Sequence, residues 1–88
     1  MLLSVSFNEV SEKSIKLFPN PVKTTLNIEL LSDNFEQAYI FNTSGVLIHT
    51  INTMQRRMNV DVTNFKTGTY YITFVSNGRA ITKRFIKK

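Results

Sequence analysis

The chain has 88 residues, no Cys and a net charge of +5. A chain of this length makes one small domain that buries only roughly 60 % of its unfolded surface. The absence of Cys excludes disulfides, thiol chemistry and thiolate metal sites. No apolar run approaches the roughly 20 residues that span a bilayer, and the first residues lack the basic and apolar regions of a signal peptide. We therefore expect no transmembrane segment and no secretion signal at the start of the sequence.

The charge is unevenly distributed along the chain. Five of the six acidic residues precede residue 37, and Asp61 is the only one after it. Eight of the eleven Lys and Arg residues lie in that later part. A cationic half favours nucleic acid, anionic lipid or an acidic protein surface, and charge alone does not choose among them.

Residues 1–13 are polar and weakly patterned, which is typical of a linker. A first strand is predicted from residue 14 up to the segment Pro19-Asn20-Pro21. Proline has no amide to donate and cannot occupy a central strand, so we expect this element at a sheet edge. The second strand is predicted where Leu26, Ile28 and Leu30 alternate with polar residues.

Two further strands follow a turn near residues 31–34, where Phe35 is expected to plug the core. One covers residues 37–42, with Ala38 and Ile40 on the same face. Gly45 supplies the positive φ of a tight turn, and the next strand covers residues 46–51. Its unbroken apolar residues leave open which face points inward.

A fifth strand is predicted from the alternation of Met58, Val60 and Val62. After it, in the segment from Thr63 to Gly68, a Thr hydroxyl is expected to cap a single helical turn that tips Phe65 into the core.

The end of the chain, residues 68–88, predicts one β-hairpin. β-Branched and aromatic residues fill both arms, and Asn77-Gly78 favours a two-residue type I′ turn between them. Tyr70, Ile72 and Phe74 share the expected core face. With no long segment of helical period, the sequence predicts an all-β, two-sheet β-sandwich of about seven short strands.

Three landmarks occur in order: Leu17-Phe-Pro-Asn-Pro21 before the strand at residues 26–30, Tyr39-Ile-Phe-Asn-Thr-Ser-Gly-Val-Leu-Ile48, and the segment from Val60 to Ile72 closed by residues 83–88. Together they resemble the type A C-terminal sorting domain of the type IX (Por) secretion system. The family's motif residues fall on Pro19, Asn20, Pro21, Gly45, Gly68, Tyr70 and Lys83. Val46 stands where the family often has Lys or Arg, and Phe65 where it usually has Leu.

The resemblance implies an Ig-like β-sandwich over residues 14–88, joined by the linker at residues 1–13 to a larger cargo protein. The cargo would cross the inner membrane by a separate signal. An outer-membrane translocon would then recognise this domain, and a sortase-like protease would usually cleave it within the linker. The cargo would end at the cell surface or secreted, and the domain itself would not be an enzyme.

The candidate recognition residues are a rigid edge and a cationic last strand. A strand with an open edge can add to a partner's sheet while its cations meet acidic groups. Each residue also has a purely structural reading, as an edge bend, a turn glycine, a core aromatic or a solvated charge. The set comprises Pro19, Asn20, Pro21, Gly68, Tyr70, Lys83, Arg84, Lys87 and Lys88.

The alternative function is a non-catalytic module for carbohydrate or a cell-surface ligand, with Tyr39, Phe41 and Tyr71 as the aromatic set. Nucleic-acid binding is less favoured, because basic and aromatic residues are not interleaved in a binding motif. We expect no cofactor or metal: His49 is the only His, and the acidic turn at residues 33–36 lacks the spacing of a calcium loop. No Ser lies in a nucleophile-elbow motif, so no catalytic residue is predicted. Sheet edges leave room for a weak dimer.

Overall fold

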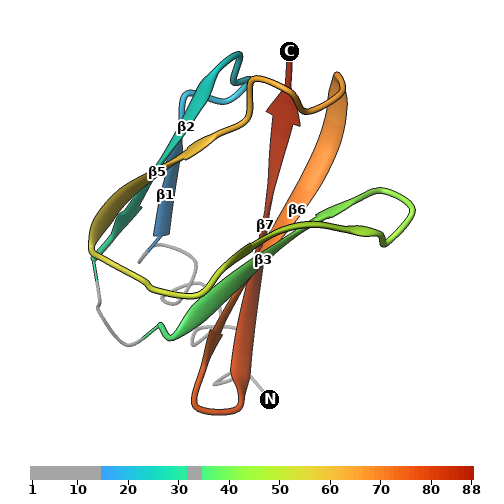
Figure 1. Ribbon diagram of the computed structural model, residues 1–88. Coiled ribbons are helices and arrows are strands. Elements are labelled where there is room, and N and C mark those ends of the chain that lie inside the picture. The colour runs from blue at the N-terminus through green and yellow to red at the C-terminus, as the bar shows by residue number, and fades with distance from the viewer. Residues whose placement is uncertain (1–14, 32–34) are drawn as a thin grey trace, which may run out of the picture.

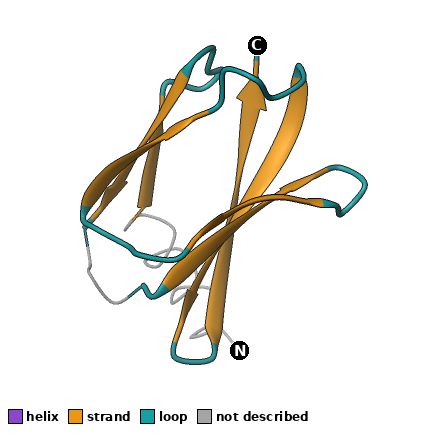
Figure 2. Cartoon of the chain, viewed as in Figure 1, coloured by secondary structure: helices purple, strands orange, loops and turns teal. Residues whose placement is uncertain are grey.

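The computed structural model describes residues 15–31 and 35–88, and over these residues Figure 2 shows strands and loops without a helix. The strands number seven, as predicted, and the expected linker at residues 1–13 lies outside the described residues. Their bounds are β1 Ile15–Phe18, β2 Thr25–Leu30, β3 Gln37–Asn42, β4 Leu47–Ile51, β5 Arg57–Asp61, β6 Gly68–Ser76 and β7 Arg79–Lys87.

The strands form two antiparallel sheets that face one another, as Figure 1 shows. One sheet has the order β1-β2-β5 and the other the order β4-β3-β6-β7. The predicted β-sandwich is therefore confirmed, and β1 is an edge strand as the prolines after it required. β7 is the edge strand of the larger sheet on the side nearer β1.

The hairpin of β6 and β7 has the predicted register and turn. Ser76 pairs with Arg79, and the two residues between them, Asn77 and Gly78, have φ values of 51° and 79°. Positive φ at both positions is the requirement of a type I′ turn, which suits the right-handed twist of the paired strands.

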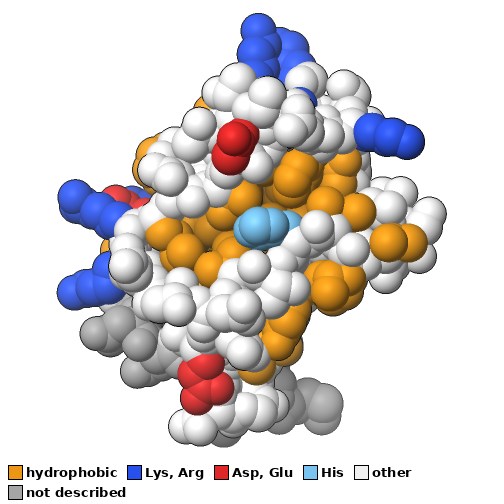
Figure 3. All heavy atoms as spheres, viewed as in Figure 1, with side chains coloured by type: hydrophobic (Ala, Val, Ile, Leu, Met, Phe, Trp, Pro, Cys, Tyr) orange, Lys and Arg blue, Asp and Glu red, His pale blue; other side chains and the backbone are white. Residues whose placement is uncertain are grey.

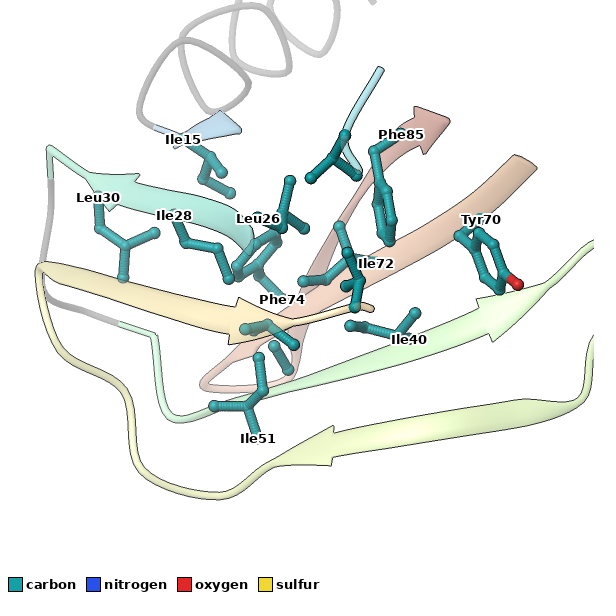
Figure 4. Packing of buried hydrophobic residues seen from close by; sticks show 14 residues of the cluster. Ile15, Leu26, Ile28, Leu30, Ile40, Ile51, Tyr70, Ile72, Phe74 and Phe85 are labelled. Carbon is teal, nitrogen blue, oxygen red and sulfur yellow. The ribbon is translucent and has the colours of Figure 1, made fainter. Parts of the chain in front are cut away.

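The core lies between the two sheets, and Figure 4 shows side chains from both filling it. Tyr70, Ile72 and Phe74 of β6 are all buried, which confirms the predicted core face. Phe35 packs its ring edge against Phe74, with ring centroids 5.8 Å apart. This contact confirms that Phe35 plugs the core from the loop before β3. Fully buried aliphatic residues of β2 supply the opposite layer.

The structure decides the register of β4. Ile51 pairs with Ala38 and is buried, whereas Leu47 and Ile48 are exposed. The pairing shifts between Ile40 and Phe41, so β4 carries a β-bulge. A bulge lets a strand of mostly apolar residues bend at the edge while only one end enters the core.

The expected helical turn after β5 is wrong, because Asp61 takes the hydrogen bonds of Thr63. The Thr63 hydroxyl donates to Asp61 Oδ1 at 2.6 Å, and the Thr63 amide donates to the same atom at 2.9 Å. A carboxylate that accepts from the amide two positions later forms an Asx turn, and residues 62–67 continue from it as turn and bend without a helix. The chain then makes one tight turn, with the Phe65 amide 3.0 Å from the Val62 carbonyl. Phe65 is half-buried, with its ring 5.2 Å from that of Tyr70.

Candidate recognition site on strand β7

β7 presents two faces of different character. Phe85 and Lys87 point inward and are buried, and Lys83 on the same face is half-buried. Thr82, Arg84 and Ile86 alternate with them and are exposed. The cations of the predicted strand therefore lie on two different faces, because successive side chains of a strand point to opposite sides of the sheet.

Tyr70 fixes the inward face of β7 by stacking. It pairs with Phe85 across the strands, and the two rings lie 5.5 Å apart and nearly parallel, at 16°. The Tyr70 hydroxyl donates to the Lys66 carbonyl at 2.6 Å. A buried tyrosine needs such an acceptor for its hydroxyl. Tyr70 is thus a core residue that also anchors the loop before β6.

Lys87 is buried, at 7 % exposure, and its ammonium group ties β7 to the turn after β5. Nζ donates to the carbonyl of Phe65 at 3.1 Å and lies 3.4 Å from that of Thr63. Gly68 is the cross-strand partner of Lys87. A buried ammonium group is tolerated when carbonyl oxygens accept its hydrogen bonds. Lys87 therefore stabilises the fold.

Lys83 links the two sheets at the same edge. Its Nζ donates to the Ile15 carbonyl of β1 at 3.3 Å. The contact joins the edge strands of the two sheets, β1 and β7.

Residues 19–22, here called the proline strap, lie along the outer edge of β7. The Asn20 side chain accepts the Ile86 amide at 2.9 Å and donates to the Arg84 carbonyl at 3.3 Å. The Val22 amide donates to the Ile86 carbonyl at 2.8 Å, and the Lys88 amide donates to the Val22 carbonyl at 2.8 Å. The peptide bonds before both prolines of the strap are cis. The strap therefore acts as a short extra partner for the end of β7, and Val22 pairs with Lys87 in parallel.

The sequence predicted a rigid edge at these prolines but missed the pairing with β7. Val22 is fully buried, and its isolated position before the second strand gave no periodic signal. Pro19 and Pro21, on either side of Asn20, have no backbone amide to donate. This was the one sign in the sequence that the Asn20 side chain could make the hydrogen bonds at this edge.

All nine candidate recognition residues lie on β7, pair with it, or follow its edge. Among them Pro19, Asn20, Pro21, Arg84 and Lys88 are exposed, Gly68 and Lys83 are half-buried, and Tyr70 and Lys87 are buried. The structure thus brings the set together. Contact of any of these residues with a translocon stays a prediction.

Figure 3 shows Lys and Arg side chains at the top of the view, where β7 ends, and a second group beside β5. Arg57, the first residue of β5, forms an ion pair with Glu29 at 3.3 Å. The hydroxyl and then the amide of Thr63 hold the pKa of Asp61 below the ordinary 3.8. The exposed Lys88 gives the end of β7 a positive charge.

The aromatic set of the alternative function lies on the outer face of the larger sheet. Phe41 and Tyr71 are cross-strand partners, and Tyr71 is 38 % exposed. Phe41 and Tyr39 are half-buried and so expose less of their rings, and the Tyr39 hydroxyl donates to Gln37 at 2.5 Å. The set has one well-exposed ring, which gives little surface for stacking a sugar.

His49 is exposed on β4, and Figure 3 shows the single His of the chain beside hydrophobic side chains. Among the described residues no group of three His, Asp or Glu side chains could hold a metal ion. Within residues 15–31 and 35–88, no helix has the length and hydrophobicity to cross a membrane.

Comparison with known families gives one match. Residues 16–88 match the family described as secretion system C-terminal sorting domain. The match begins inside β1 and includes the proline strap and all of β7. No curated protein matches the chain.

Proposed function

Because the chain belongs to the family of C-terminal sorting domains of the type IX (Por) secretion system, we propose that it is the part of a larger cargo protein that the secretion machinery recognises. The family is not a class of enzymes. The observation that supports the proposal most directly is that the match runs from the second residue of β1 to the end of β7.

The proposed mechanism is recognition of a folded surface. The inward face of β7 is used for packing, so the outward face and the strap are what a partner can touch. Arg84 and Lys88 are the exposed cations of this surface, and Ile86 between them is 39 % exposed. A hydrophobic side chain flanked by cations suits a partner surface with an apolar centre and an acidic rim.

Lys83 and Lys87 have a supporting role in this mechanism. Both ammonium groups hydrogen-bond to carbonyls of neighbouring segments and hold β7 in place. Tyr70 and Gly68 act in the same way, through the stacked ring and the pairing with β7. Their replacement would disturb recognition by displacing the strand.

We further propose that the cargo precedes the linker at residues 1–13 and crosses the outer membrane with this domain, to be released or retained at the cell surface. Cleavage by a sortase-like protease would fall in the segment at residues 1–13. This proposal is supported by the family alone.

The test is a fusion of an inner-membrane export signal and a reporter to residues 1–88, expressed in a bacterium with a type IX secretion system. We expect the reporter at the cell surface or in the medium. The same fusion should stay in the periplasm of a strain without the translocon. A reporter without the domain should stay there in both strains.

Equal release from the two strains would contradict the proposal, because the domain would then not depend on the translocon. Retention of the complete fusion in the periplasm of the competent strain would contradict it as well. Mass spectrometry of the released reporter would show whether the domain has been cleaved, and at which bond.

A further inference from the structure

The outer edge of β7 divides into a covered half and an open half. The Ile86 amide and carbonyl both bond to the strap, so the backbone of Ile86 points away from β6. Alternation along an antiparallel strand gives the backbone groups of Arg84, Thr82 and Ala80 the same orientation. The Arg84 carbonyl also bonds to the strap. Within the described residues, the outward backbone groups of Ala80 and Thr82 and the Arg84 amide have no backbone partner.

We propose that this open half, residues 80–84, is where a partner adds a strand, and that the proline strap sets its limit. The inference rests on the proposed function and deepens it by naming the mode of contact. A partner strand that ran further would have to displace Asn20 and Val22 from four hydrogen bonds.

β7 is better suited to strand addition than the other edge of its sheet. It has nine residues, whereas β4 has five and carries a bulge. Bulges and short length are the usual ways of blunting an edge, because they spoil the regular row of donors and acceptors. Residues 80–84 are exposed or half-buried and offer roughly the five residues of an average strand.

Charge indicates the chemistry of the partner. The exposed cation Arg84 lies at one end of the open half, and the whole chain carries +5. Two copies of this edge side by side would bring like charges together, which disfavours a dimer through β7. The fitting occupant is an extended segment of another protein that carries acidic side chains.

Thr82→Pro tests the edge directly. The Thr82 amide points away from β6, so proline there removes no bond of the hairpin but blocks a partner strand. Thr82→Val is the matched control, because it also loses the Thr82 hydroxyl contact to Thr73 at 2.9 Å and keeps the amide. Thr50→Pro places a proline on the opposite edge strand, β4, as a second control.

The measurement is the secreted fraction of the reporter fusion in the competent strain. We expect Thr82→Pro to lower it about tenfold or more, because the loss of the Thr82 amide leaves a carbonyl of the partner strand without its donor. Thr82→Val and Thr50→Pro should stay near the parent. Secretion of Thr82→Pro at the parent level overturns the inference, while the secreted parent still supports the sorting function. If the parent itself stays in the periplasm, the sorting function fails and the inference with it.

Thermal unfolding will show whether Thr82→Pro folds. If it does not, two variants of opposite charge at the same position test the inference instead. Thr82→Asp and Thr82→Lys both lose the Thr73 contact and differ in sign of charge. We expect Thr82→Asp to lower secretion and Thr82→Lys to leave it near the Thr82→Val level. Equal secretion of the two overturns the acidic partner, as does a dimer of the purified chain in light scattering that Thr82→Asp abolishes.

Discussion

The side chain of Asn20 takes the place of a neighbouring strand for Ile86. Its Oδ1 accepts the Ile86 amide at 2.9 Å, across 66 residues of sequence. The other end of the same amide group donates to the Arg84 carbonyl at 3.3 Å. One side chain thereby satisfies a donor and an acceptor of an edge strand, which keeps that part of the edge from pairing with other chains.

We expect Asn20→Ala to lower the free energy of unfolding by about 1–2 kcal/mol, because two hydrogen bonds are lost at an exposed site. Denaturant unfolding measures the change. Asn59→Ala, at an exposed position of β5, is the control and should alter stability by less than about 0.5 kcal/mol. Hydrogen exchange at the Ile86 amide should speed up in Asn20→Ala. An unchanged exchange rate there would show that the contact does not form in solution.

Phe85 and Ile86 are neighbours with opposite environments. Phe85 is fully buried against Tyr70, and Ile86 is 39 % exposed. We expect Phe85→Ala to cost about 3–5 kcal/mol, enough to unfold much of a small domain. Ile86→Ala should cost well under about 1 kcal/mol. Thermal unfolding of the two variants measures both losses of stability. Similar losses would mean that Phe85 does not point into the core and Ile86 does not point to solvent.

Lys87→Met should destabilise the domain although both residues have long side chains. The substitution leaves the Phe65 and Thr63 carbonyls without the ammonium donor, at a cost of about 1–3 kcal/mol. Lys88→Met removes the adjacent, exposed charge and should be nearly neutral. Denaturant unfolding of the pair compares the buried with the exposed cation. Equal stability of the two variants would contradict the interior position of Lys87.

Asp61 gives the stability a dependence on pH. Hydrogen bonds from Thr63 hold its pKa below 3.8 in the folded state. A group whose pKa is lowered by folding stabilises the fold above its unfolded pKa. That contribution is lost as the pH falls through the folded pKa, here below about 4. We therefore expect the stability difference between the parent and Asp61→Asn to shrink on acidification from pH 6 to that range.

Thr63→Ala provides an independent check on Asp61. Loss of the hydroxyl should raise the pKa of Asp61 toward 3.8, as followed by NMR titration of its carboxyl carbon. An Asp61 pKa that is the same in both proteins would show that the turn after β5 is not held by this contact.

Much of the fold follows from local patterns. The alternation in β2 and β6 correctly predicted the buried faces, and Asn77-Gly78 correctly predicted the type I′ turn. The buried faces could be predicted because apolar residues recur at every second position of a strand that has one buried face. β4 could not be assigned, since a run of apolar residues has no period and a bulge changes its register.

The candidate site was only partly predictable. The alternation of Lys83, Phe85 and Lys87 in the sequence already places both lysines on the side of the buried aromatic. Which carbonyls meet Lys87, and that Asn20 meets Ile86, depends on how distant segments pack together. Such contacts leave no periodic signal. The turn after β5 was mistaken because two hydrogen-bonding residues, Asp61 and Thr63, competed for one role.

The central claim is that the outward face of β7 is the recognised surface of a sorting domain, and charge reversal tests it most directly. Arg84→Glu with Lys88→Glu changes two exposed cations of this surface. Arg56→Glu with Arg57→Glu changes two exposed cations beside β5 by the same amount. We predict that the first pair holds the reporter fusion in the periplasm and that the second pair is secreted like the parent. Secretion of both pairs at the parent level would contradict the account.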